Sequence, residues 1–372
     1  MRYRVLLVGG GTAGHVEPAL AVGRTLRQQD HLTSGAIQIE CEFLGTKSGL
    51  ERELVPSAGF KLHSIAKAPL PRKLNLSTVI WPFRFVFSIL QSLALVKKFD
   101  LIIGFGGYVS APAYIAGWIL RVPVIIHEAN AKPGWANNLG SRVAKISTVA
   151  FEGAQSAGGN WAGAKLVGMP IREEVRLVAN LQKNEISELK SKICSELNLD
   201  SKAPVLLAFG GSLGSVSMNN ALSGARNDLA KLGINLIQIV GMKNVLPPAS
   251  KGFAPLTYAS NMAELYAISD LVIARSGAVT CAELMVTGKF ALLVPLAIGN
   301  GEQTANASAL VRAGQAEICD NTHFTSEWLV SNISRLLSAS QGREGKLNPF
   351  ANGQAAEQQL VEMALSLLVG TK

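Results

Sequence analysis

Short apolar runs alternate with amphipathic segments along most of the chain. The runs are typical of strands buried on both faces, and they stand at 4–8, 37–44, 101–104, 122–126, 205–209, 234–240, 270–274 and 290–294. The first amphipathic segment carries Ala19, Leu20, Val22 and Leu26 on one helical face. Strands that alternate with helices predict parallel sheets.

The same strand, glycine turn and helix occur twice. Near the start, RVLLVGGGTAGHVEP joins a strand at 4–8 to a turn at 9–14 and a helix that begins near His15 or Val16. From Pro204, VLLAFGGSLGS repeats the arrangement. In a chain of 372 residues this repeat predicts two domains. The predicted fold class is therefore α/β, with two Rossmann-like, doubly wound parallel-sheet domains facing each other across a cleft.

The motif GMPIR marks the expected domain junction. We place an N-terminal domain at 1–168 and a C-terminal domain at 169–354. The charged stretch 172–201 predicts one or two solvated helices that bridge the domains. A last amphipathic helix within about 355–372 has a face for packing back onto either domain, the N-terminal one included, formed by Leu360, Met363, Ala364 and Leu367.

The charge balance favours anionic partners. Lys and Arg number 35 against 26 acidic residues, a net charge of +9. Phosphorylated substrates or an acidic membrane surface fit this excess, and nucleic acid fits least, because aromatic residues are sparse. Four scattered cysteines argue against a disulfide framework or zinc cluster and suit a reducing compartment, namely Cys41, Cys194, Cys281 and Cys319. The first strand begins so early that we expect no secretory signal.

The stretch 79–96 is the longest hydrophobic segment. Pro82 and Arg84 interrupt it and leave 85–96, which is too short to span a bilayer and suits a buried or interfacial helix. Basic and large apolar residues interleave over 65–87: Lys67, Leu70, Arg72, Lys73, Leu74, Ile80, Trp81, Phe83, Arg84, Phe85 and Phe87. This mixture predicts a face that docks on a membrane, and the alternative is a loop that leads into a core helix.

The first glycine turn predicts an anion site, because backbone N–H groups and the helix dipole favour negative charge there. Gly9, Gly11 and Gly14 fit the dinucleotide spacing, but the expected acidic residue at the end of the second strand is absent. A turn needed only for packing is the alternative. At a helix start, His15 is expected to be neutral and able to act as a general base, or else to bond a local carbonyl.

Two further groups invite structural as well as functional interpretations. In RSGAVTCAEL, Thr280 and Glu283 have the spacing of a capping box, and Glu283 also suits a ribose diol. His127 and Glu128 follow a strand, and we expect a mutual hydrogen bond that shapes the loop. The sequence contains no Walker A lysine, metal-ligand cluster or G-x-S-x-G motif, so we expect no metal or cofactor.

Seven segments together carry a family resemblance. In chain order they are GGGTAGHVEPALAV, IGFGGYVSAP, HEANAKPGWAN, GMPIR, FGGSLGSVSMN, NMAELYAISDLVIARSGAVTCAEL and GNGEQTANA. This ordered set resembles the MurG family, the UDP-N-acetylglucosamine transferases of peptidoglycan synthesis. The resemblance implies a GT-B fold and inverting transfer of GlcNAc from UDP-GlcNAc to the MurNAc 4-hydroxyl of undecaprenyl-pyrophosphoryl-MurNAc-pentapeptide. It also implies peripheral binding at the cytoplasmic face of the bacterial membrane.

The resemblance implies roles for particular residues. His15 is the catalytic base, with Thr12, Ala13 and Gly14 at the acceptor. Asn130 touches the donor sugar. Arg172 and Ser212 face the UDP diphosphate. The remaining implied substrate-binding residues are Asn219, Ala259, Ala278, Val279, Thr280, Glu283 at the ribose, and Glu302 with Gln303 at the GlcNAc hydroxyls.

Some positions depart from the family pattern, and other functions remain open. The departures are Ala13, Ala129, Met169, Asn300 and the run Ser215, Val216 and Ser217, where the family usually has an arginine. One alternative is another GT-B enzyme using a UDP-sugar, either a transferase with a soluble acceptor or a UDP-GlcNAc 2-epimerase. The others are a nicotinamide-dependent oxidoreductase and a nucleotide-sugar-binding protein without catalysis.

Overall fold

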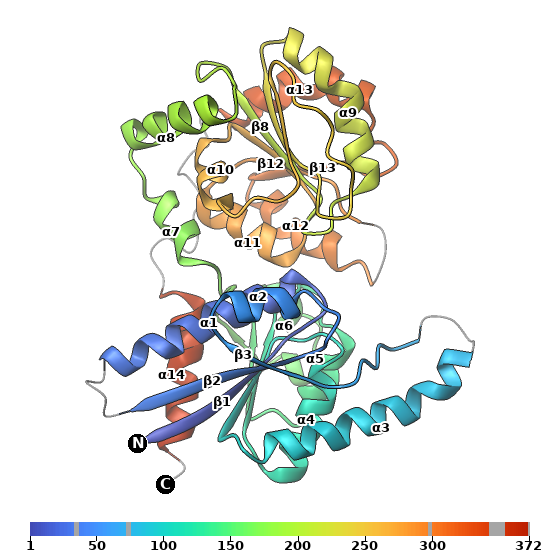
Figure 1. Cartoon of the computed structure of the whole chain (residues 1–372), viewed down its shortest axis with the longest axis vertical. Helices are drawn as coiled ribbons and strands as arrows, with labels where there is room; N and C mark the ends of the chain where they lie inside the picture. Colours follow the sequence, from blue (N-terminus) through green and yellow to red (C-terminus); the bar gives the residue numbers. More distant parts are fainter. Residues whose placement is uncertain (33–36, 72–75, 297–299, 342–353, 371–372) are drawn as a thin grey trace. The chain divides into compact units, whose positions relative to one another are not determined.

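A computed structural model of the chain describes residues 1–32, 37–71, 76–296, 300–341 and 354–370 (Figure 1). Arg72, Lys73 and Leu74 of the expected docking face lie outside the described residues. Two compact units make up the chain. The first comprises Met1–Arg172 and Gln354–Lys372, and the second comprises Glu173–Gly353.

The first unit is built on a seven-stranded parallel sheet with the order β3-β2-β1-β4-β5-β6-β7. Its strands are β1 (Arg2–Val8), β2 (Gln38–Gly45), β3 (Lys61–Ser64), β4 (Leu101–Gly104), β5 (Val124–Glu128), β6 (Ile146–Val149) and β7 (Lys165–Leu166). Its helices are α1 (Ala13–Leu32), α2 (Glu51–Ser57), α3 (Leu76–Val96), α4 (Ser110–Leu120), α5 (Trp135–Gly140), α6 (Glu152–Gln155), the 3-10 turn η1 (Gly159–Trp161) and α14 (Ala356–Val369).

Both faces of this sheet are covered, as the alternation along β1 requires. Val5 and Leu7 face a core shared with α1, α2 and α14. Leu6 and Val8 face the opposite core, which holds residues of α3 and α4. The C-terminal helix α14 thus completes the first unit through Leu360 and Leu368, which are buried beside α1.

The second unit has a six-stranded parallel sheet with the order β10-β9-β8-β11-β12-β13. Its strands are β8 (Val205–Phe209), β9 (Asn235–Ile239), β10 (Phe253–Leu256), β11 (Leu271–Ala274), β12 (Ala291–Leu293) and β13 (Ala316–Ile318). Its helices are α7 (Glu173–Ala179), α8 (Lys183–Glu196), α9 (Val216–Lys231), α10 (Met262–Ile268), α11 (Ala278–Thr287), α12 (Glu302–Arg312) and α13 (Ser326–Ser340). The charged stretch after the junction forms α7 and α8, both of which contact α10.

The strands expected from apolar runs are confirmed, whereas β3, β6, β7, β10 and β13 were not expected. The additional strands lie toward the edges of the two sheets. Edge strands are short and need apolar residues on fewer positions, so they leave a weaker pattern in the sequence. The strand β3, for example, reads Lys-Leu-His-Ser.

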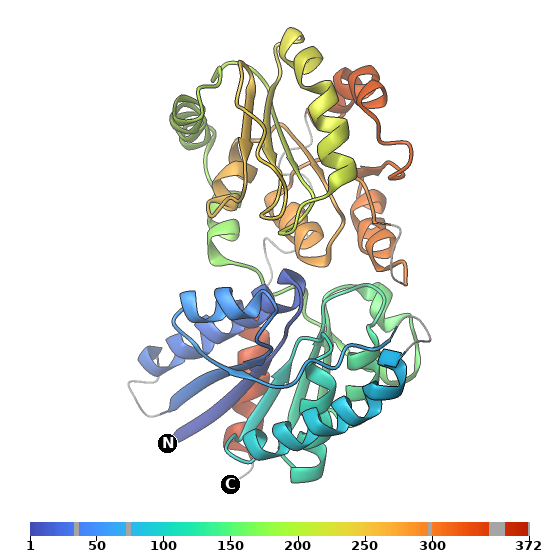
Figure 2. The same cartoon turned by 45° about the vertical axis from the view of Figure 1, so that its right-hand side comes forward.

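The interruption expected at Pro82 and Arg84 is wrong, because α3 runs unbroken from Leu76 to Val96. An interior proline removes one backbone donor and its ring crowds the carbonyl four residues earlier, yet α3 continues through Pro82. Within the described residues, Thr78–Val96 is long and apolar enough to cross a membrane, by length and composition alone. In the first unit, α3 lies along α4, and Figures 1 and 2 show its N-terminal half extending beyond that contact.

Candidate functional site

The first glycine loop joins β1 to α1 and is closed by backbone bonds. Gly11 has φ of 92°, a left-handed conformation that favours glycine. The Thr12 carbonyl accepts hydrogen bonds from the backbone N–H groups of His15 (3.1 Å) and Val16 (3.3 Å). The helix begins at Ala13, two or three residues earlier than expected, so His15 lies within its first turn. Thr12 is exposed, while Ala13, Gly14 and His15 are half-buried.

The imidazole of His15 is oriented by contacts of one of its nitrogens, Nδ1. Its Nδ1 atom lies 3.2 Å from the Gly10 carbonyl oxygen and 3.2 Å from the Thr12 hydroxyl. Because a carbonyl can only accept, the bond to Gly10 places the proton on Nδ1 and leaves a lone pair on Nε2. Burial lowers the pKa of His15 below 6.5, while the Gly10 carbonyl and the Glu51 carboxylate act in the opposite direction. A neutral imidazole with a free Nε2 lone pair can accept a proton.

A second glycine loop, after β4, packs against the first. Gly106 (φ 93°) and Gly107 (φ 84°) both adopt left-handed conformations. A Cβ atom on Gly106 would lie 3.4 Å from Nε2 of His15, and one on Gly107 would lie 2.3 Å from the Gly10 carbonyl oxygen. Only glycine permits these approaches, so the second loop forms one wall of the His15 site.

A buried carboxylate that the sequence did not suggest supports the first loop. Glu51, at the start of α2, is fully buried. It accepts hydrogen bonds from the backbone N–H of Gly11 (3.0 Å) and from both the backbone N–H (2.9 Å) and the hydroxyl of Thr46 (2.8 Å). In the sequence, Glu51 lies beside Arg52 and Glu53 and looks like an ordinary solvent-facing helix start. The nearby glycines Gly45 and Gly49 were a signal in the sequence that another group comes close to the backbone there. In the structure that group is Glu51, with which an added Cβ at either glycine would collide.

The loop after β5 is organised by Glu128, which burial leaves with a raised pKa. Its carboxylate accepts from the Asn130 backbone (2.8 Å), the Gly134 backbone (3.1 Å) and the Asn137 amide (2.9 Å). The Asn137 amide also lies near Gly106, so this loop adjoins the wall of the His15 site. Asn130 therefore belongs to a loop whose conformation is held by hydrogen bonds to the buried Glu128 carboxylate.

The hydrogen bond expected between His127 and Glu128 is wrong. Neighbouring residues of a strand point to opposite faces, so the two side chains diverge. His127 Nδ1 instead lies 3.0 Å from the Thr148 hydroxyl, which donates to the Ile126 carbonyl. Burial lowers the pKa of His127 to about 3, so this histidine is neutral. Its role in the fold is that of a core residue beside Phe105.

The second unit carries its own glycine loop between β8 and α9. Gly211 (φ 90°) and Gly214 (φ 76°) have left-handed conformations, and half-buried Ser212 lies between them. The Ser215 hydroxyl accepts from the backbone N–H of Met218 (3.4 Å) and caps α9. The open turn and helix start provide backbone donors for an anion.

An arginine reaches this helix start from another element. Arg275 follows β11 and is buried, and its guanidinium donates to the hydroxyls of Ser215 (2.7 Å) and Ser217 (3.0 Å). It also donates to the Val294 carbonyl (2.9 Å). Burial lowers the pKa of Arg275, which nevertheless stays cationic. Ser215 and Ser217 belong to the run where the family usually has an arginine. In this chain they bind Arg275, which comes from the segment RSGAVTCAEL.

The capping box expected from Thr280 and Glu283 is wrong. Helix α11 begins at Ala278 with Gly277 as its N-cap and no side-chain cap bond, so Thr280 lies inside the first turn. The buried Glu283 carboxylate instead accepts a hydrogen bond from the Tyr266 hydroxyl (3.0 Å). Ala278, Val279, Thr280 and Glu283 therefore share one short helix.

The other expected residues of the second unit lie on several elements. Asn219, on α9, donates to the Val240 carbonyl (3.0 Å) and is engaged in joining α9 to the end of β9. Ala259 is buried just before α10. Glu302 accepts from the Asn300 backbone (3.1 Å), and Gln303 accepts from the Leu296 backbone (2.9 Å), at the start of α12. Arg172 is half-buried and ends the first stretch of the first unit.

The described residues include no group of three or more His, Cys, Asp or Glu that could hold a metal ion. The two glycine loops present different groups of the chain itself. These are a neutral imidazole in the first unit, and backbone donors with a buried guanidinium in the second.

The chain resembles known proteins over nearly its whole length. Residues 5–148 match the glycosyltransferase family 28 N-terminal domain, and residues 205–360 match the C-terminal domain of that family. The crystal structure of MurG from Acinetobacter baumannii superposes with a TM-score of 0.71 at 28% identity and covers 98% of this chain and 99% of that chain. The UDP-GlcNAc 2-epimerase of Neisseria meningitidis, at 12% identity and a TM-score of 0.67, shares the fold.

Curated relatives are closer in sequence. A protein of Corynebacterium efficiens is 42% identical over 331 residues, which is 88% of this chain and 87% of the relative. A protein of Nocardia farcinica is 40% identical over 345 residues, 90% of this chain and 87% of the relative. Both are named UDP-N-acetylglucosamine–N-acetylmuramyl-(pentapeptide) pyrophosphoryl-undecaprenol N-acetylglucosamine transferase.

Two Rossmann-like parallel-sheet units, each with a glycine loop that opens a helix, form a GT-B fold, and the match to both family 28 domain models makes the chain a glycosyltransferase. The match to both domain models and the identity to the curated relatives then fix its group. The chain belongs to the MurG family of glycosyltransferase family 28.

Proposed function

We propose that the chain is an inverting glycosyltransferase. It moves GlcNAc from UDP-GlcNAc to the MurNAc 4-hydroxyl of undecaprenyl-pyrophosphoryl-MurNAc-pentapeptide. The observation that carries this proposal is the neutral His15 imidazole, fixed through Nδ1 to the Gly10 carbonyl and bordered at Nε2 by Gly106. The identity of about 40% to relatives named for this transfer supports the choice of substrates.

In this proposal the first unit binds the acceptor. The glycine loop and the α1 start, with Thr12, Ala13 and Gly14, lie at the sugar and diphosphate, and Nε2 of His15 takes the proton from the 4-hydroxyl. The deprotonated oxygen attacks the anomeric carbon of GlcNAc from the face opposite UDP, which inverts its configuration. Asn130, held by Glu128, contacts the donor sugar from the same unit.

The second unit binds the donor. Ser212 and the start of α9 face the UDP diphosphate, where backbone donors and the Arg275 charge stabilise the departing UDP. Arg172 adds a second cation for this diphosphate. Glu283, with Ala278, Val279 and Thr280 on the same helix, binds the ribose end. Gln303 and Glu302 bind GlcNAc hydroxyls, and Ala259 and Asn219 complete the nucleotide side.

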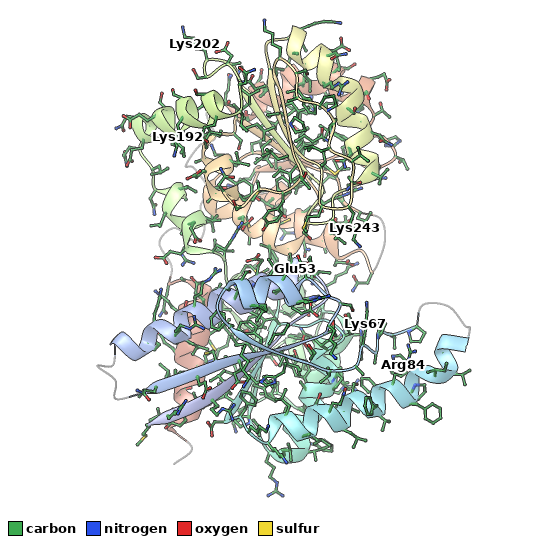
Figure 3. All side chains as sticks on the ribbon, viewed as in Figure 1. Glu53, Lys67, Arg84, Lys192, Lys202 and Lys243 are labelled. Atoms are coloured by element: carbon green, nitrogen blue, oxygen red, sulfur yellow. The ribbon has the colours of Figure 1, made fainter. Side chains whose placement is uncertain are left out.

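The exposed part of α3 supports a peripheral place on the cytoplasmic face of the bacterial membrane. Phe83 is 75% exposed, and Phe87 and Val86 are 54% exposed, an unusual display for a helix that packs on its own unit. Arg84 lies among them on α3 and is exposed (Figure 3). Apolar side chains that enter the interface, with cations at anionic head groups, suit an enzyme whose acceptor is an anionic lipid.

A transfer assay tests the function. The purified chain is incubated with UDP-GlcNAc and a short-chain lipid-linked MurNAc-pentapeptide acceptor, and UDP and the disaccharide product are measured. We expect UDP release only with the acceptor, together with a β-linked disaccharide. Formation of a 2-epimer without the acceptor would instead favour an epimerase. Donor binding without UDP release in a folded preparation would favour a binding protein.

A further inference from the structure

The buried Glu51 carboxylate and the His15 imidazole bond to the same backbone amide. The peptide unit between Gly10 and Gly11 supplies a carbonyl oxygen, which belongs to Gly10, and an N–H group, which belongs to Gly11. His15 Nδ1 lies 3.2 Å from that oxygen, and Glu51 Oε2 accepts from that N–H at 3.0 Å. One amide therefore connects the acid to the histidine through two hydrogen bonds.

Three donors serve the two carboxylate oxygens of Glu51. Oε1 accepts from the backbone N–H (2.9 Å) and the hydroxyl (2.8 Å) of Thr46, and Oε2 accepts from Gly11. The side chain is fully buried, and hydrogen bonds from several donors stabilise an ionised carboxylate in such a place. Glu51 thus brings a negative charge next to the first glycine loop.

Three glycines make room for this side chain. A Cβ atom on Gly10 would lie 2.9 Å from Glu51 Oε1, and Cβ atoms on Gly45 and Gly49 would lie closer still to the same side chain. Contacts of that length are too short for a real side chain, so only glycine fits at these positions. Gly10 is also the residue whose carbonyl bonds His15, so it contacts both ends of the link.

The link transmits the effect of a charge and not a proton. A carboxylate that accepts from an amide N–H polarises the amide, which makes its carbonyl oxygen a stronger acceptor. A stronger acceptor at Nδ1 favours the imidazolium form of the histidine. Burial lowers the pKa of His15 most, and the Gly10 carbonyl and the Glu51 charge both raise it.

Among the described residues, the charged side chain that acts on the pKa of His15 is Glu51. Other titratable groups face the two glycine loops from several elements. They are Tyr108 beside Gly11 with Lys67 over its ring, Glu128 behind the Asn137 amide, the core residue His127, and the exposed Arg52 and Glu53 of α2.

We propose that Glu51 is a positioning residue for the His15 base and acts on it through the peptide unit between Gly10 and Gly11. The inference rests on the proposed function. When Nε2 takes the proton of the 4-hydroxyl, an O–H bond breaks, an N–H bond forms and the imidazole becomes a cation. The Nδ1 proton stays on Nδ1, and the imidazolium later releases the transferred proton to water. The Glu51 charge stabilises that cation and lowers the barrier without contacting a substrate.

A histidine titration tests the link without turnover. The imidazole signals of the folded chain are followed by NMR as the pH changes, and the His15 signal is identified by its loss in His15→Ala. In Glu51→Gln, His15 should become protonated at a lower pH than in the wild type, because the negative charge that favours the imidazolium is gone. Glu53→Gln makes the same charge change at an exposed position of the same helix (Figure 3) and should leave the titration unchanged. An unchanged titration in Glu51→Gln, or equal shifts in the two variants, would overturn the proposal.

Transfer kinetics separate the effect of the charge from support of the loop. We expect Glu51→Gln to lower kcat about tenfold, the scale of a lost hydrogen bond to a charged group, while the KM values for acceptor and donor stay near wild type. The acid limb of kcat/KM for the acceptor should move to lower pH. Thr46→Val removes one hydrogen bond from the same carboxylate but keeps its charge, so the acid limb should stay in place. Equal movement of the limb in both variants would show that Glu51 acts through folding alone and would refute the proposal.

A wild-type measurement covers the case in which Glu51→Gln does not fold. The Gly11 amide proton is followed by NMR while His15 is protonated. We expect it to shift downfield with the same midpoint as the imidazole, because the cation strengthens the bond from this amide to Glu51. A Gly11 signal without that midpoint would contradict the link. A folded wild type without transfer activity would refute the proposed function, while both NMR titrations would still judge the link.

Discussion

One hydrogen bond, between His15 Nδ1 and the Gly10 carbonyl oxygen, decides which imidazole nitrogen can take a proton. Because Nδ1 donates to the carbonyl at 3.2 Å, Nε2 keeps its lone pair. The sequence identified the histidine and its neutral form from its position at a helix start. From the sequence, His15 could be either a general base or a side chain that hydrogen-bonds a local carbonyl. In the folded chain the two roles are compatible, because the hydrogen bond to the Gly10 carbonyl leaves the Nε2 lone pair free to accept a proton.

His15→Ala should separate binding from chemistry. Transfer should fall at least about a hundredfold, the usual loss when a positioned base is removed. UDP binding should be unchanged, because the proposed donor residues lie in the second unit. Isothermal titration with UDP and the transfer assay measure the two quantities. Near-normal transfer would remove His15 from the role of base.

The pH dependence of transfer follows from the same residue. Burial lowers the pKa of His15 below 6.5, so the imidazole stays neutral to a lower pH than an exposed histidine. The acid limb of kcat/KM for the acceptor should therefore lie below pH 6.5. A pH–rate profile checks the position of this limb. An acid limb above pH 6.5 would contradict the burial argument.

At the scale of elements, the two glycine loops of the first unit pack directly against each other. Gly107 lies so close to the Gly10 carbonyl that no side chain fits between the loops. The sequence shows Gly106 and Gly107 as an adjacent pair of glycines. It did not predict that the approaching group is the other loop, because β1 and β4 become neighbours only when the sheet forms.

Gly107→Ala should push the loops apart. The added Cβ would lie 2.3 Å from the Gly10 carbonyl oxygen, and the residue has φ of 84°. We expect a loss of about 1–3 kcal/mol in the free energy of unfolding, together with lower transfer. Urea unfolding measures the first quantity. Gly163→Ala is the control, since an added Cβ there meets nothing within 4 Å, and equal stability of the two variants would refute the close contact.

The strand pair β2–β3 carries a buried acid whose titration affects folding. Burial alone would raise the pKa of Glu42, but hydrogen bonds from His63, Arg4 and Lys61 hold it at about 2. Since this value lies below the ordinary 4.5, the stabilisation is present above pH 4.5 and is lost as the pH falls toward 2. The stability difference between wild type and Glu42→Gln in urea unfolding should therefore shrink from pH 7 to pH 3. A difference that does not change with pH would contradict this account.

At the scale of the whole molecule, the exposed apolar side chains of α3 form a surface suited to a membrane. Liposome co-sedimentation tests the proposed docking. The pair Phe83→Ser and Phe87→Ser should weaken binding to acidic vesicles at least about tenfold, because it removes two large apolar groups from the interface. Transfer to a water-soluble short-chain acceptor should not change.

Val245→Ser is the matched control for this surface. Val245 is 91% exposed, but it belongs to the second unit, so its substitution should leave vesicle binding intact. Equal binding by the α3 double variant and the wild type would show that this surface does not dock. Equal losses in the α3 variant and the control would point to a general effect of surface polarity.

By itself, the sequence determined the α/β class, the two parallel sheets and the helix-opening glycine loops. Those features are local, since apolar runs, glycine turns and helical spacing act over a few neighbouring residues. Its errors at Thr280, His127 and Pro82 arose where a local pattern allowed more than one outcome. The cap, the hydrogen-bond partner and the helix continuity depended on residues farther along the chain.

Tertiary structure alone decided the positions of Glu51 under the first loop and of Arg275 against Ser215 and Ser217. It also placed one peptide unit between the Glu51 carboxylate and the His15 imidazole. Each of these groupings joins residues from different strand–helix units, and packing brings them together only once the sheets have formed. Spacing along the chain does not encode such proximity, because parallel strands pair in an order that differs from the order of the sequence.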